Sequence, residues 1–198
     1  MNGAHLNTVR PEYLLNTGDY TKFLKLYPKE ENMKPKVVER VYPYIAMESW
    51  LTIFYQVLRI YYLNRITPKN FKALPGISSV EATVDPPMQK SNIYSVAETI
   101  LLKWMSYHVG LINPTQARQL TNFDSDLQDS TVFACLIKSH YGETANLKQF
   151  RMIATNSDQV LNNAKMILKA VDEIGIQTHI SPNDIAEPSA RELLLFCV

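Results

Sequence analysis

The most informative part of the sequence is the acidic run Leu120-Thr121-Asn122-Phe123-Asp124-Ser125-Asp126-Leu127-Gln128-Asp129. Phe123 and Leu127 are large apolar side chains inside an otherwise polar segment, which predicts that they enter a core. The carboxylates can accept backbone N–H groups at the start of the next helix, where the helix dipole favours negative charge. We therefore predict a turn anchored in the core, followed by a helix that Asp129 or Ser130 caps.

Helical periodicity flanks this run on both sides. Apolar residues recur every three or four positions, and no alternating pattern typical of strands competes with them. Ser181 is expected to cap a short helix, because proline and an acid follow at its first and third positions. The fold class is therefore all-α. The expected helices cover residues 20–27, 47–62, 67–74, 96–110, 130–142, 156–175, 181–185 and 188–198. Asp19 is a possible cap of the first of these helices, and Pro43 suits the first turn of the second.

Composition suggests two parts of opposite charge. Residues 1–90 contain 12 Lys and Arg against 8 Asp and Glu, a net of +4, whereas residues 91–198 contain 8 against 11, a net of −3. A proline-rich linker is predicted at about 74–90, where no helical period continues. This divides the chain into a helical extension at 1–90 and a domain at 91–198. Because the last helix ends in an apolar run without a cap, we expect a fragment of a longer protein.

Four ordered blocks of the second part resemble the calponin-homology family. Leu101 and Trp104 are similar to the Leu-x-x-Trp core of its first helix, and the acidic run to its Asn-Phe-x-x-Asp-Leu-x-Asp turn. The family usually has Gly where this chain has Ser130, so either the backbone needs no positive φ there or Ser130 serves as the cap. The resemblance implies a helical bundle with Trp104 at its centre. Its expected core is Leu101, Trp104, Phe123, Leu127, Phe133, Leu136 and Ile185, and its caps are Asp129 and Ser181.

The first 90 residues show no second copy of this domain, although the actin cross-linkers of the family resemble one another in having two. A helical extension before a single domain, with Arg65-Ile66-Thr67-Pro68-Lys69-Asn70-Phe71, is similar to the large cilia- and flagella-associated members. That resemblance implies a non-catalytic scaffold in the cytoplasm, at the cytoskeleton and in the axoneme of a cilium or flagellum. Its partner would be an axonemal or other cytoskeletal protein. Direct binding to actin or microtubules remains the alternative.

Few residues suit catalysis, metal binding or a cofactor. An EF-hand loop that starts at Asp124 would need Gly where Asp129 stands and Glu where Cys135 stands. The histidines are scattered and the glycines isolated, so neither a zinc motif nor a phosphate loop is expected. We expect no cofactor and no enzyme, although dispersed catalytic residues remain an open alternative. The net charge of +1 and the acidic residues among Lys22–Arg40 argue against nucleic acid, and no apolar run is long enough for a membrane span.

The aromatic segment around Trp50 predicts a helix with two faces. Trp50, Phe54 and Leu58 are expected to pack against the domain, because exposing such side chains is unfavourable by about 1.5–3 kcal/mol each. Tyrosine and arginine off this stripe are typical of interface cores. They could hold a protein partner or, in a signalling adaptor, a peptide helix. The candidate partner face is Tyr44, Tyr55, Arg59, Tyr62 and Arg65.

Overall fold

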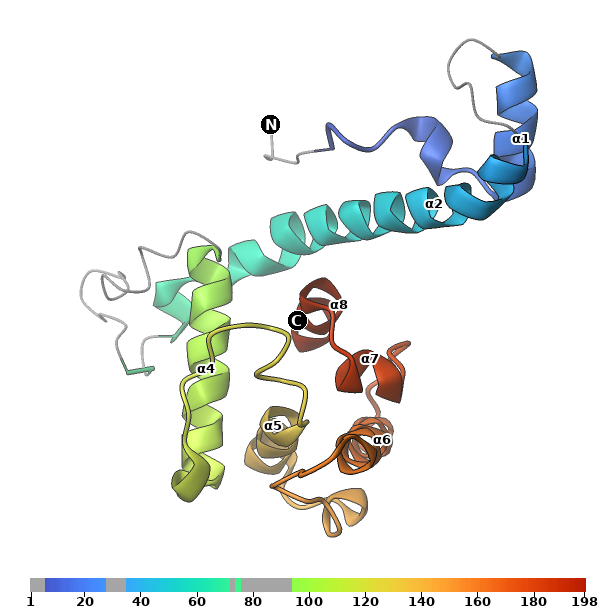
Figure 1. Cartoon of the computed structure of the whole chain (residues 1–198). Coiled ribbons are helices and arrows are strands. Elements are labelled where there is room, and N and C mark those ends of the chain that lie inside the picture. The colour runs from blue at the N-terminus through green and yellow to red at the C-terminus, as the bar shows by residue number, and fades with distance from the viewer. Residues whose placement is uncertain (1–5, 28–34, 72–73, 76–93) are drawn as a thin grey trace. The chain divides into compact units, whose positions relative to one another are not determined.

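The computed structural model describes residues 6–27, 35–71, 74–75 and 94–198 (Figure 1). These residues form helices and turns without any strand, which confirms the all-α prediction. The chain divides into two compact units, an N-terminal unit of residues 1–62 and a C-terminal unit of residues 63–198. This division comes earlier in the chain than the predicted linker, of which residues 76–90 lie outside the described residues.

The N-terminal unit consists of a short 3₁₀ turn at Pro11–Leu14, helix α1 at Thr17–Leu26 and helix α2 at Pro35–Val57. A π-helical turn at Leu58–Tyr62 continues α2. Figure 1 shows α1 packed against the N-terminal part of α2.

Two sequence expectations about this unit are wrong. The cap of α1 is Asn16 and not Asp19, because the Asn16 side chain accepts the Asp19 N–H at 2.9 Å. Pro43 does not occupy the first turn of its helix. Pro35 begins α2, where its missing N–H leaves no bond unmade, and Pro43 lies inside the helix.

Two stacked tyrosines form the core of the N-terminal unit. The rings of Tyr20 and Tyr42 lie 3.8 Å apart, nearly parallel, and both residues are 1% exposed. The Tyr42 hydroxyl donates towards the carbonyl oxygens of Glu12 and Leu15, at 2.9 and 2.7 Å. Burial raises the pKa of Tyr42. One side chain thus joins α2 to the segment that precedes α1.

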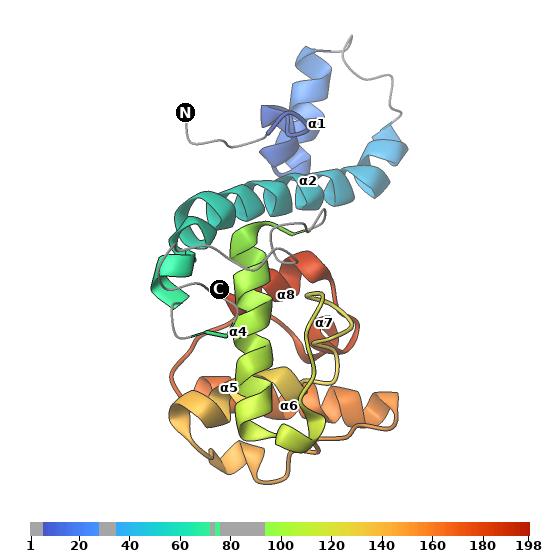
Figure 2. The same cartoon turned by 90° about the vertical axis from the view of Figure 1, so that its left-hand side faces the viewer.

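The C-terminal unit contains α4 at Val96–Ile112, α5 at Thr131–Tyr141 and α6 at Ser157–Glu173. Two shorter helices follow, α7 at Pro182–Ala186 and α8 at Ala190–Cys197. Figure 2 shows α4 in front of α5, and these two helices pack against each other. Short 3₁₀ turns at Leu63–Arg65, Pro68–Phe71, Pro114–Gln116 and Ala145–Leu147 complete the unit.

Helix ends in this unit follow local backbone chemistry. Gly142 and Gly175 have φ values of 79° and 83°, and they end α5 and α6 as predicted. Ser181 lies at the cap of α7 and forms a reciprocal capping box with Asp184. The predicted end of α4 near Gly110 lies close to the observed one: the helix continues to Ile112 and closes on Asn113, whose N–H donates to the Val109 carbonyl oxygen.

The core of the C-terminal unit is mostly aliphatic. Ile100, Met105 and Ala164 are fully buried, and five of the seven expected core residues are at most 5% exposed: Leu101, Phe123, Leu127, Phe133 and Ile185. Trp104 and Leu136 are only half-buried, so the expectation that Trp104 fills the centre is wrong. Trp104 packs at the edge of the Leu74–Ile100 contact and beside His108.

Candidate functional site

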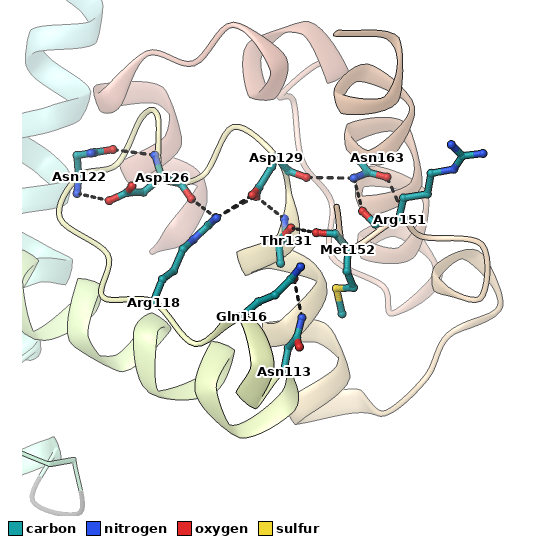
Figure 3. Close-up of polar contacts among 10 residues, drawn as sticks. All are labelled: Asn113, Gln116, Arg118, Asn122, Asp126, Asp129, Thr131, Arg151, Met152 and Asn163. Atoms are coloured by element: carbon teal, nitrogen blue, oxygen red, sulfur yellow. Dashed lines mark hydrogen bonds and ion pairs between the residues drawn. The ribbon is translucent and has the colours of Figure 1, made fainter. Parts of the chain in front are cut away.

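The acidic run folds into a closed polar turn between α4 and α5 (Figure 3). The Asp126 carboxylate accepts the backbone N–H groups of Thr121 and Asn122 at 2.6 and 3.2 Å. The Asn122 side-chain oxygen in turn accepts the N–H groups of Asp124 and Asp126 at 3.1 and 3.0 Å. The Asp126 carboxylate and the Asn122 amide oxygen thus accept backbone N–H groups, and the turn that they close holds Phe123 and Leu127 in the core.

Arg118 stabilises the end of this turn. Its guanidinium binds the Asp129 carboxylate through two bonds of 2.9 and 3.1 Å and donates to the Asp126 carbonyl at 2.8 Å (Figure 3). Because the Arg118 and Asp129 side chains are 39% and 30% exposed, this ion pair contributes at most about 1 kcal/mol. Its role is to fix geometry, because the bidentate contact orients Asp129 towards the Thr131 N–H at 2.9 Å.

A buried asparagine connects the turn to α6. Asn163 is 1% exposed, and its amide donates to the carbonyl oxygens of Asp129 and Arg151 at 3.2 and 2.8 Å (Figure 3). Its side-chain oxygen accepts the Arg151 N–H at 3.3 Å. Sequence reasoning did not identify Arg118 or Asn163. The sequence signal for Asn163 is an asparagine among the apolar positions of the predicted helix at 156–175.

Ser130 overturns the first sequence-based alternative, that the backbone needs no positive φ here, and it occupies the cap position of α5 without a capping bond from its side chain. Its φ is 64°, in the left-handed region that favours glycine, and its side chain makes no capping bond. The residue is fully buried, and its hydroxyl has no hydrogen-bond partner among the described residues. Asp129, one residue earlier, instead accepts the first free N–H of α5, from Thr131. Ser130 thus adopts a positive φ that favours the family's usual glycine, and it also buries a hydroxyl without a partner among the described residues.

The candidate partner face on α2 is largely open to solvent. Tyr44 and Tyr62 are 67% and 51% exposed, Arg59 is exposed and Tyr55 is half-buried. Arg65 is also exposed but belongs to the C-terminal unit. The four residues of the N-terminal unit therefore form the face that the structure describes.

Two of the three members of the Trp50 stripe are exposed, and their packing against the domain stays a prediction. Trp50 and Phe54 are 42% and 53% exposed, while Leu58 is buried. The reason is that α2 turns Tyr42 and Ala46 towards the core of its own unit. An exposed apolar stripe remains on α2, formed by Met47, Trp50, Phe54, Val57 and Tyr61.

Two histidines meet between α4 and α5. The rings of His108 and His140 lie 4.6 Å apart, and His108 Nδ1 is 2.6 Å from Ser139 Oγ. Burial, and secondly the charge of His140, lower the pKa of His108. The described residues contain no group of three or more ligating side chains for a metal ion. In the same part of the chain, no helix is long and apolar enough to cross a membrane.

Two family models match different parts of the chain. The family model of the calponin homology (CH) domain matches residues 95–198, and that of the cilia- and flagella-associated protein 47 domain matches residues 1–66. No solved structure matches the chain.

The chain is similar over 99% of its length to cilia- and flagella-associated protein 47 of Mus musculus and of Homo sapiens, with 27% and 28% identity. It spans about 7% of the length of these relatives. Fimbrin-5 of Arabidopsis thaliana is 28% identical over 78% of the chain and 20% of its own length. Because the CH match covers more than half of its residues, the chain belongs to the calponin-homology domain family.

Proposed function

We propose that this chain is a non-catalytic docking module of a large ciliary or flagellar scaffold protein. The supporting observation is the order of the two family matches, an N-terminal unit like that of cilia- and flagella-associated protein 47 followed by a CH domain. The polar side chains of the acidic run are engaged in holding the turn and the start of α5, which suits a rigid block. Docking energy would then come from exposed surface.

The surface that suits this role is the tyrosine-rich face of α2. Tyr44 and Tyr62 combine a large apolar ring with a polar hydroxyl, and Arg59 lies on the same helical segment. Tyrosine and arginine are enriched at interface hot spots, and a tyrosine buries much area at little entropic cost. The partner that this face fits is another axonemal protein. The docking of this unit on the CH domain stays a prediction.

Retention on axonemes tests this function directly. The tagged chain is expected to stay bound to detergent-extracted axonemes. The amount of the double variant Tyr44→Ala, Tyr62→Ala that stays bound is expected to be about tenfold lower, or less. Tyr107→Ala is the matched control, since Tyr107 is 45% exposed but belongs to the other unit. Equal retention of the wild type and the double variant would contradict docking through α2.

Direct filament binding is the second candidate, because the family resemblance includes actin cross-linkers and microtubule binders. The net charge of −3 in residues 91–198 opposes binding of that part to an acidic filament surface. Co-sedimentation with purified microtubules and, separately, actin filaments distinguishes the candidates. Pelleting at physiological salt would favour the filament, and a soluble chain would favour a protein partner.

A further inference from the structure

The contact between the C-terminal parts of α4 and α5 contains two ionisable rings. His108 of α4 and His140 of α5 have ring centroids 4.6 Å apart, and the Trp104 ring contacts both, at 4.8 and 5.6 Å. His108 is 8% exposed, whereas His140 lies in the last turn of α5 and is exposed. The two helices thus meet through one buried and one exposed imidazole that lie against each other.

The surroundings of His140 suit a positive charge. Because its ring is exposed, the charged form keeps part of its hydration. The residue lies at the C-terminus of a helix, where the dipole favours a cation. The indole of Trp104 stacks on the ring with the two planes 28° apart, and the face of an indole attracts a cation. His140 can therefore take up a proton and keep its contacts.

The surroundings of His108 suit the neutral ring. Its Nδ1 atom is 2.6 Å from Ser139 Oγ, and among the described residues this hydroxyl is the hydrogen-bond partner of the ring. A charged imidazole has two N–H donors, so the second donor would be buried without an acceptor. Burial, and secondly the charge of His140, lower the pKa of His108. A proton on His140 therefore opposes a second proton on its neighbour.

Other ionisable groups near the pair do not neutralise it. These side chains are Lys103 and Tyr107 of α4, Lys138 and Tyr141 of α5, Cys197 of α8 and Glu143. The tyrosines and the cysteine are uncharged near neutral pH. Lys138 is paired with Glu143 at 3.3 Å, and Lys103 has an interaction of its own. In the described part of the chain no carboxylate forms an ion pair with either histidine, so two charges on the pair would repel each other.

We propose that the His108–His140 pair makes the α4–α5 contact a pH-sensitive switch. Near neutral pH the two rings and Trp104 pack together and keep the ends of the two helices in contact. In acid both rings can hold a proton only when these ends separate, because like charges in contact repel and the buried ring must reach water. The switch belongs to the CH domain, so it does not depend on the partner of the α2 face.

NMR titration of the histidine ring protons in the full chain tests the coupling. His140→Gln should move the midpoint of the His108 titration to higher pH, because it removes the neighbouring charge. His140→Lys should move the midpoint to lower pH, because the cation is then permanent. His179→Gln is the matched control at another exposed histidine and should leave the midpoint in place. The same midpoint in all four proteins would overturn the proposal.

Hydrogen exchange tests whether the two helix ends separate. Protection factors, corrected for the intrinsic exchange rate at each pH, should fall by about fivefold or more between about pH 7.5 and 5.5 in the last turns of α4 and α5, while α6 keeps its protection. The loss should vanish in His108→Gln. It should also be smaller in His140→Gln, which provides the test if the buried substitution prevents folding. A loss spread evenly over the CH domain would mean a general acid effect and would reject the switch.

Discussion

The N-terminal and C-terminal units are both helical, yet different kinds of side chain form their cores. In the N-terminal unit the central contact is the Tyr20–Tyr42 stack, and the Tyr42 hydroxyl is directed at two backbone carbonyls. In the C-terminal unit aliphatic side chains such as Ile100 and Ile167 fill the centre, and polar groups gather in one turn. In the smaller unit a single side chain, Tyr42, both packs in the core and donates hydrogen bonds. In the larger unit different side chains fill the core and make the polar contacts.

The largest expected effect tests the packed core of the C-terminal unit. Phe123→Ala should lower the free energy of unfolding by about 3–5 kcal/mol, because it opens a cavity where Phe123 is 1% exposed. The ring also loses its edge contact with Tyr94, at a centroid distance of 5.5 Å. Urea unfolding followed by circular dichroism measures the change. Tyr107→Ala, at a residue that is 45% exposed, serves as the control and should cost much less.

A stabilising change is expected at Ser130. Ser130→Gly should raise the free energy of unfolding by about 1–2 kcal/mol, since glycine adopts a φ of 64° without the penalty of a Cβ atom. The substitution also removes a buried hydroxyl that has no partner among the described residues. Thermal and urea denaturation both measure the gain.

Ser130→Ala separates the two causes of the expected gain. Alanine removes the hydroxyl but keeps the left-handed backbone, so its stability should lie below that of the glycine variant. Loss of stability in Ser130→Gly would show that the hydroxyl has a favourable role that the structure does not reveal.

A smaller effect is expected for the hydroxyl in the N-terminal unit. Tyr42→Phe keeps the ring stack but removes the donor to Glu12 and Leu15, which should cost about 0.5–1.5 kcal/mol. Hydrogen exchange at the amides of α1 and α2 follows this unit separately from the CH domain. Tyr44→Phe, at a residue that is 67% exposed, should change nothing. Equal protection in all three proteins would show that stacking alone holds the unit.

The smallest expected effect is a pH dependence in the α4–α5 contact. The pKa of His108 is lowered in the folded protein, so the unfolded chain takes up the proton first as pH falls. Above the ordinary histidine pKa, His108 is neutral in both states and the full stability is present. This stability is lost as the pH falls below that value and through the lower pKa that His108 has in the folded protein. The melting temperature should therefore drop between about pH 7.5 and 5.5. His108→Gln should flatten this drop, and an unchanged slope would assign it to other groups.

Several features could be predicted from the sequence because they depend on neighbours in the chain. Helical spacing indicated α4, α5 and α6, and the ends at Gly142 and Gly175 follow from glycine's access to positive φ. Ser181 could be assigned as a cap because its partner is three residues away. The acidic run could also be recognised from the sequence, because the hydrogen bonds of its turn join residues that are at most five positions apart.

Other features depended on contacts between distant residues. The partial exposure of Trp104, the burial of Asn163 and the orientation of α2 result from which faces the helices turn to one another. Periodicity identifies an apolar stripe around Trp50, but it does not show that α2 turns Tyr42 and Ala46 to the core of its own unit instead. An apolar pocket lined by residues of α4, α5, α6 and α8 likewise forms only where helices far apart in the chain meet. The sequence by itself thus determined the helices and the family, while tertiary packing decided which surfaces remain for a partner.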